Sequence, residues 1–154
     1  MYTIHDIIDK LILIEEHAHE FYRSVSENPQ VDIKVAVVAK AFSSQEQKHI
    51  KIYESLKENF DEEENTFIDF SIYDRAAKLI YEFTKMQNMQ NITGLKEIID
   101  FALNFEKENL ALILSIKGLL IRSQNDVDTA NYKALIAIIE EEQKHIKDIE
   151  SVSA

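Results

Sequence analysis

The stretch Glu46-Gln47-Lys48-His49-Ile50-Lys51 occurs a second time, unchanged, as Glu142-Gln143-Lys144-His145-Ile146-Lys147. Glu54-Ser55 and Glu150-Ser151 extend the identity to eight of ten positions, and a chance repeat of this length is very rare. Repetition of a segment at this spacing is typical of a chain built from copies of one structural unit. The repeat therefore predicts two similar halves, each a helical hairpin whose second helix carries the same hexamer.

Apolar residues around both copies recur at steps of three and four, which is the period of an amphipathic helix. This pattern predicts long helices over about 4–27, 32–59, 95–122 and 129–152, and a shorter helical piece over 72–83. Thr3 with Asp6 resembles a capping box for the first helix, and Thr93 is the expected cap of the third long one. Polar stretches at 61–64, 87–91 and 123–128 are expected to be loops. The predicted fold class is all-α, a four-helix bundle with a long crossover, carrying the short helix, between the second and third long helices.

Length and composition agree with this fold and exclude several classes of protein. The chain has 154 residues, which suits one domain over 1–154, and only 2 Gly and 1 Pro, too few for a many-stranded sandwich or barrel. Cysteine is absent, so there is no disulfide framework or thiolate metal site. With 28 acidic and 17 basic residues, the net charge of −11 disfavours nucleic acid and anionic membranes as partners. No apolar run is long enough to span a membrane, and no signal peptide is recognised, so we expect a cytoplasmic protein.

Each long helix interrupts its apolar stripe with a glutamate near mid-length, and two helices add a histidine three residues later. Residues three and four apart share one face of a helix, so these groups face the interior of the bundle. The six residues are Glu15, Glu46, His49, Glu106, Glu142 and His145. Four buried carboxylates without compensation would destabilise the fold strongly, whereas two divalent cations would balance their charge. Ligand sets rich in oxygen with one imidazole per metal suit iron or manganese, and zinc could also bind.

This ordered set of six residues resembles the rubrerythrin-related branch of the ferritin-like di-iron carboxylate superfamily. The segment from Glu15 through Ala18 to Phe21-Tyr22 looks like the first-helix signature of that branch, and Glu46-x-x-His49 looks like its second. The resemblance covers nearly the whole chain. It implies two iron ions in an oxo-bridged centre that reacts with hydrogen peroxide or dioxygen, as a peroxidase or a ferroxidase. It also implies a homodimer and a separate electron-donor protein.

The chain departs from its expected relatives at three points. Because it has no cysteine, it lacks the rubredoxin domain of full rubrerythrins. Asn109 stands where rubrerythrins have an additional glutamate. Gln47 occupies the position of the haem-ligating methionine of bacterioferritins, so we expect no haem.

Two further interpretations stay open at the level of sequence. The chain could bind or sequester iron without turnover, or it could be a structural helical module whose carboxylates bind zinc or nothing. Tyr22 lies seven residues after Glu15 on the same helical face, so it is a candidate hydrogen-bond or electron donor beside the metals. A packed core aromatic is the plainer interpretation of Tyr22.

Overall fold

The computed structural model describes residues 2–59, 67–87, 92–122 and 129–153. Five helices and a pair of very short strands follow one another along the chain in this part. Their bounds are β1 (Tyr2–Thr3), α1 (Ile4–Glu27), α2 (Ile33–Asn59), β2 (Phe67–Ile68), α3 (Phe70–Met86), α4 (Leu95–Leu120) and α5 (Ala130–Ser153). The fold is all-α, as predicted, and none of the described helices is long and apolar enough to cross a membrane.

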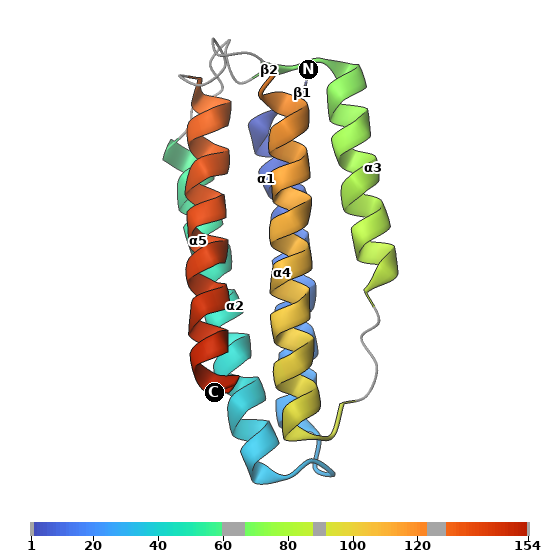
Figure 1. Ribbon diagram of the computed structural model, residues 1–154, viewed down its shortest axis with the longest axis vertical. Coiled ribbons are helices and arrows are strands. Elements are labelled where there is room, and N and C mark those ends of the chain that lie inside the picture. The colour runs from blue at the N-terminus through green and yellow to red at the C-terminus, as the bar shows by residue number, and fades with distance from the viewer. Residues whose placement is uncertain (1, 60–66, 88–91, 123–128, 154) are drawn as a thin grey trace.

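Two antiparallel hairpins form the bundle: α1 with α2, and α4 with α5. In Figure 1 the α4–α5 hairpin lies in front of the α1–α2 hairpin, and α3 runs alongside α4 on the outside. The crossover between the second and fourth helices therefore carries its own helix, α3, which is longer than the predicted span of 72–83. The crossover is anchored at the amino-terminal end, where Tyr2 pairs with Ile68 across the two strands and stacks on Tyr73 at 3.8 Å between ring centroids.

Helix α1 begins as the sequence predicts, because the capping box is formed. The Thr3 side chain accepts a hydrogen bond from the His5 backbone at 3.2 Å, and the Thr3 backbone donates to Asp6 at 2.8 Å. The expected cap of the third long helix was wrong. Gly94 occupies the cap position of α4 without any side-chain hydrogen bond, and Thr93 lies outside the helix. The predicted loops at 61–64 and 123–128, and most of the one at 87–91, lie outside the described residues.

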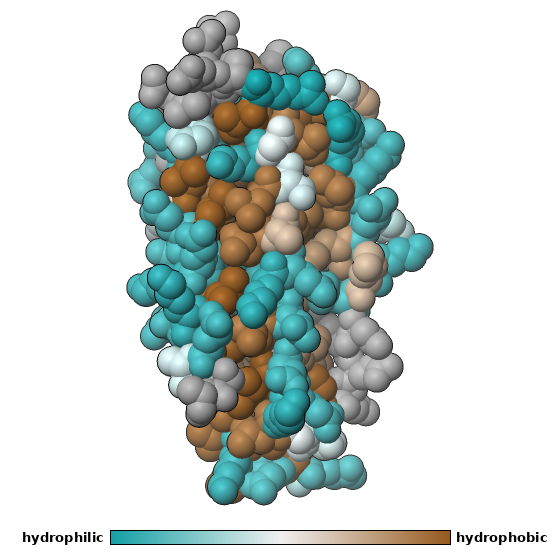
Figure 2. Space-filling model, viewed as in Figure 1, coloured by the Kyte–Doolittle hydropathy of each residue, from teal (hydrophilic) through white to brown (hydrophobic). Residues whose placement is uncertain are grey.

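An apolar core fills most of the length of the bundle. The predicted stripes provide it: Ile8 and Leu11 of α1, Ile98 of α4 and Leu135 of α5 are each at most 1% exposed. Figure 2 shows apolar side chains at the surface between hydrophilic flanks, on the face that α4 and α5 present. Leu114 of α4 is exposed. The core is interrupted near mid-length by a layer of buried polar side chains.

Candidate metal centre

The polar layer consists of the six residues that the sequence singles out. Four helices contribute to it: Glu15 from α1, the Glu46/His49 pair from α2, Glu106 from α4 and the Glu142/His145 pair from α5. All four carboxylates have no exposed surface, and the two histidines are 6% and 5% exposed. The structure thus brings all six predicted side chains together, because each one lies on the inward face of its helix at the same level.

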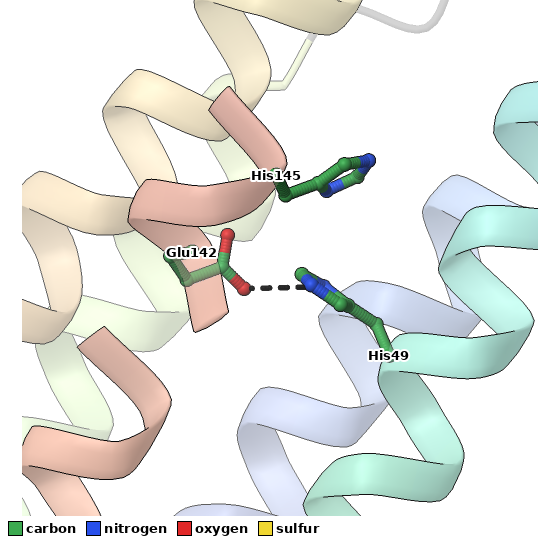
Figure 3. Close-up of side chains that lie close together, drawn as sticks. All are labelled: His49, Glu142 and His145. Atoms are coloured by element: carbon green, nitrogen blue, oxygen red, sulfur yellow. Dashed lines mark ion pairs between the residues drawn. The ribbon is translucent and has the colours of Figure 1, made fainter. Parts of the chain in front are cut away.

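One ring nitrogen of each histidine, Nδ1, points into this layer. His49 Nδ1 lies 3.5 Å from Glu142 and 3.9 Å from Glu15 (Figure 3 shows the first of these contacts). On the other side, His145 Nδ1 lies 3.2 Å from Glu106 and 3.7 Å from Glu46. Each histidine therefore approaches a carboxylate on each of two other helices.

Most of the inward-facing atoms lack a hydrogen-bond partner. Among the described residues, the Nδ1 atoms of both histidines and at least one oxygen of each of the four glutamates are buried and unsatisfied. Buried polar atoms are almost always hydrogen-bonded, so a cluster of buried polar atoms without partners needs a physical explanation. Ligand atoms of these residues form four overlapping groups, each with three atoms within 4.8 Å of one another. Carboxylate oxygens and imidazole nitrogens converging in this way fit a pair of divalent cations.

The electrostatics of the metal-free layer show an excess of buried negative charge. Burial raises the pKa of Glu46, and repulsion from Glu106 and Glu15 raises it further. The pKa of Glu142 is raised for the same reasons, burial first and Glu106 next. Four carboxylates in one dry layer cannot all be ionised, so protons occupy the place of the missing positive charge.

The remaining charges are distributed unevenly across the layer. Burial would raise the pKa of Glu106, but its close contact with His145 and the attraction between the two groups outweigh burial and lower that pKa. Burial lowers the pKa of His49, but its contact with Glu15 raises it overall. In the metal-free layer, Glu46 and Glu142 thus hold protons while Glu106 stays ionised. Such a site releases protons when a cation binds, since the ligands must be deprotonated.

Tyr53 of α2 also belongs to the site, although it is not among the six residues that the sequence pattern singles out. Its hydroxyl donates a short hydrogen bond to Glu142. Burial and the charge of Glu142 raise the pKa of Tyr53 well above its ordinary value, so the phenol keeps its proton. A signal was present in the sequence: Tyr53 follows Glu46 by seven residues, the same spacing that separates Tyr22 from Glu15.

Tyr22 lies fully buried beside the site but does not bond to it. Its hydroxyl has no hydrogen-bond partner among the described residues, and its ring packs edge-on against Phe42 at 5.4 Å between centroids. Burial raises the pKa of Tyr22, with further contributions from Glu46 and the other nearby carboxylates. The hydroxyl is therefore close enough to sense the charge of the layer, and it makes no hydrogen bond to the described residues of the layer.

Two amides that the sequence analysis did not assign hold ligand candidates in place. Asn109 of α4 donates from Nδ2 to Glu15 at 2.9 Å, so this residue contacts the carboxylate layer as a donor. Gln45 of α2 contacts His145 of α5, with 2.9 Å between Oε1 and Nε2. Both contacts join different helices, which is why helical spacing within one segment could not predict them.

An open pocket of about 220 Å³ leads from the surface to the two histidines between α2 and α5. It is lined by Gln45, Lys48, His49, Ile52, Glu141, Lys144, His145 and Asp148. The pocket has room for water and other small molecules, and it reaches the layer from the side of the histidines.

Comparison with known proteins bears on the fold. A crystal structure from Thermotoga maritima, described as a "putative ferritin-like diiron-carboxylate protein", aligns with 97% of this chain and 93% of its own. The TM-score is 0.51 and the sequence identity is 20%. The fold is ferritin-like. No family model matches the sequence, and no curated protein does either. The ferritin-like bundle of this chain thus carries a buried cluster of glutamates and histidines that could hold metal ions.

Proposed function

We propose that this chain is a di-iron carboxylate protein that uses two irons to reduce hydrogen peroxide or dioxygen. The observation that carries the proposal is the layer of four fully buried glutamates and two histidines whose inward-facing atoms lack partners. A helical module without a metal would gain stability by replacing these groups with apolar ones. Their joint presence at one level of a ferritin-like bundle therefore supports a bound pair of cations.

The residues divide into two sets around the proposed metals. Glu15 and His49 lie on one side, Glu106 and His145 lie on the other, and Glu46 and Glu142 lie within reach of both histidines. Two ferrous ions held there would supply the two electrons that, with two protons, convert one hydrogen peroxide to two waters.

The surroundings of the layer serve the same reaction. The pocket between α2 and α5 admits a small oxidant on the histidine side, and the apolar core around the layer keeps bulk water out. Tyr53 holds a proton at Glu142 and keeps that carboxyl oriented. Glu46 and Glu142, whose pKa values are raised, give up their protons when they bind a cation, so protons are available near the reacting centre.

The order of the residues along the chain supports a rubrerythrin-like chemistry in particular. Because the chain has no cysteine, electrons would come from a separate donor protein. We also propose that the protein works in the cytoplasm and as a homodimer. Exposed apolar residues such as Val37 of α2 and Leu114 of α4 are consistent with burial against a second copy.

An anaerobic ferrous titration of the metal-free protein tests the proposal directly. We expect saturation at two irons per chain, and rapid formation of ferric absorption in the near ultraviolet after one equivalent of hydrogen peroxide per site. The variants E46A and E142A should lose most of the iron binding, since each removes a carboxylate placed between the two histidines. E140A is the matched control, because Glu140 is exposed on the same helix as Glu142.

The same experiment separates the two alternatives. An iron-sequestering protein would take up two irons that peroxide oxidises no faster than free ferrous ion. A structural module would keep its metal content, or its stability, in E46A and E142A. If either variant binds two irons as tightly as the unaltered protein, the six-residue layer is not the metal site.

A further inference from the structure

Asn109 of α4 is buried against the carboxylate layer and is only 1% exposed. Its Nδ2 donates a hydrogen bond to Oε1 of Glu15 on α1 at 2.9 Å. The other oxygen of that carboxylate, Oε2, lies 3.9 Å from Nδ1 of His49 and has no hydrogen-bond partner among the described residues. One oxygen of Glu15 is therefore held by the amide, while the other faces His49.

Glu106 is the counterpart of Glu15 in the second half of the chain, and no donor holds it in this way. Its Oε1 lies 3.2 Å from Nδ1 of His145, and both of its oxygens lack a hydrogen-bond partner in the described part of the chain. Asn109 follows Glu106 by three residues on α4. The equivalent residue on α1, three after Glu15, is the fully buried Ala18. Because a methyl group cannot donate a hydrogen bond, α1 offers Glu106 no equivalent of the bond that α4 gives to Glu15.

The other two carboxylates of the layer differ in the same way. Glu142, which faces His49, accepts a hydrogen bond from the Tyr53 hydroxyl. Glu46, which faces His145, has no hydrogen-bond partner for either oxygen within the described structure. Both carboxylates that face His49 are thus held by a neutral donor, and neither carboxylate that faces His145 is held by one among the described residues.

We infer that Asn109 is a positioning residue that directs Oε2 of Glu15 toward the cation bound at His49. The inference rests on the proposed metal site and assigns to one residue the orientation of one ligand of that site. Hydrogen-bond partners of ligating carboxylates typically change metal affinity by about 10- to 100-fold. Because Asn109 bonds to Glu15, which faces His49, its effect falls mainly on the cation position at His49 and not on the one at His145.

Zinc titration followed by long-range ¹H–¹⁵N NMR of the histidine rings tests this role, because zinc is diamagnetic and binds imidazole and carboxylate. The shift of each Nδ1 reports how far its own position is filled. In N109L, which replaces the amide with an apolar side chain of similar size, zinc affinity at His49 should fall about tenfold relative to that at His145. A general loss of packing would instead weaken both positions alike. N109A removes the same donor with a smaller side chain, and it should change the ratio of the two affinities in the same direction.

Asn104 provides the matched control, because it is exposed on the same helix. In N104L the ratio of the two affinities should stay within about twofold of that in the unaltered protein, as expected for a surface substitution. A crystal structure of the zinc-loaded unaltered protein should show Nδ2 of Asn109 still within about 3.2 Å of Oε1 of Glu15.

Three results would overturn the inference. One is a ratio in N109L and N109A that stays within about twofold of the original, or moves toward His49, while both histidines still bind zinc. Another is a zinc-loaded structure in which the bond between Asn109 and Glu15 is broken. In both cases the proposed metal site still stands. If neither Nδ1 shifts with zinc in the unaltered protein, the proposed metal site itself fails, and the inference fails with it.

Discussion

Tyr22 and Tyr53 are two fully buried tyrosines that flank the carboxylate layer, and they differ in one hydrogen bond. The Tyr53 hydroxyl donates to Glu142, whereas the Tyr22 hydroxyl has no partner among the described residues. A buried hydroxyl stabilises a fold only when it is bonded, and an unsatisfied one is destabilising. Replacing each tyrosine with phenylalanine therefore makes a matched pair of variants, each of which removes one buried hydroxyl from one side of the site.

In the metal-free protein, Y53F should lower the free energy of unfolding by about 1–3 kcal/mol, because Glu142 loses its donor inside a dry layer. Y22F should leave the free energy of unfolding unchanged or raise it, because it removes an unsatisfied group. Urea denaturation of both variants measures the difference. A loss in Y22F as large as that in Y53F would show that the Tyr22 hydroxyl is bonded after all.

At the scale of the element, the helices depend on local signals near their ends. Helix α1 carries Glu15 and begins with a capping box. The side chains of Thr3 and Asp6 each accept a hydrogen bond from the other residue's backbone N–H. Helix α4 carries Glu106 and begins at Leu95, and Gly94 at its cap position makes no side-chain hydrogen bond. Both threonines were predicted as caps from the sequence, and only Thr3 acts as one.

The substitution T3A should therefore lower the free energy of unfolding by about 1 kcal/mol, the usual effect of losing a cap side chain. T93A is the comparison, and it should change stability by less than about 0.5 kcal/mol because Thr93 is exposed and outside the helix. Thermal or urea unfolding of T3A and T93A in the same buffer measures the two losses of stability. Equal losses in the two variants would mean that Thr93 does contribute to the start of α4.

At the scale of the whole molecule, the buried layer makes the stability of the metal-free fold depend on pH. Glu46 and Glu142 have raised pKa values in the folded state, so the folded protein holds their protons more tightly than the unfolded chain does. Their contribution to stability is complete below the ordinary carboxyl pKa and is lost as the pH rises through the raised values. The raised pKa of His49 acts in the same direction.

We expect the melting temperature of the metal-free protein to fall, relative to that of E46Q/E142Q, as the pH rises above the ordinary carboxyl pKa of about 4.3, because the variant lacks both titrating carboxyls. A divalent cation at about 100 times its Kd should restore about 2.7 kcal/mol to the unaltered protein and much less to the variant. Differential scanning calorimetry with and without metal measures both effects. If the melting temperatures of the two metal-free proteins change with pH in the same way, the pKa values of Glu46 and Glu142 are not raised in the folded protein.

The sequence by itself determined the helices and the membership of the polar layer. Periodicity is a local property, so the span of α1 was predicted at 4–27 and is observed as Ile4–Glu27. For the same reason Glu46 and His49 could be placed on one inward face, since three residues apart on a helix means one face whatever the helix packs against. The glutamate on each long helix then implied that the four would meet at one level.

Only the tertiary structure decided which groups contact each other across the helices. The bonds from Tyr53 to Glu142 and from Asn109 to Glu15, and the contact between Gln45 and His145, all join residues far apart in sequence. Each depends on the rotation and axial offset of one helix against another, which side-chain packing determines and helical periodicity does not specify. The sequence could therefore identify the ligand candidates, while the packing of the four helices selected the residues that orient them.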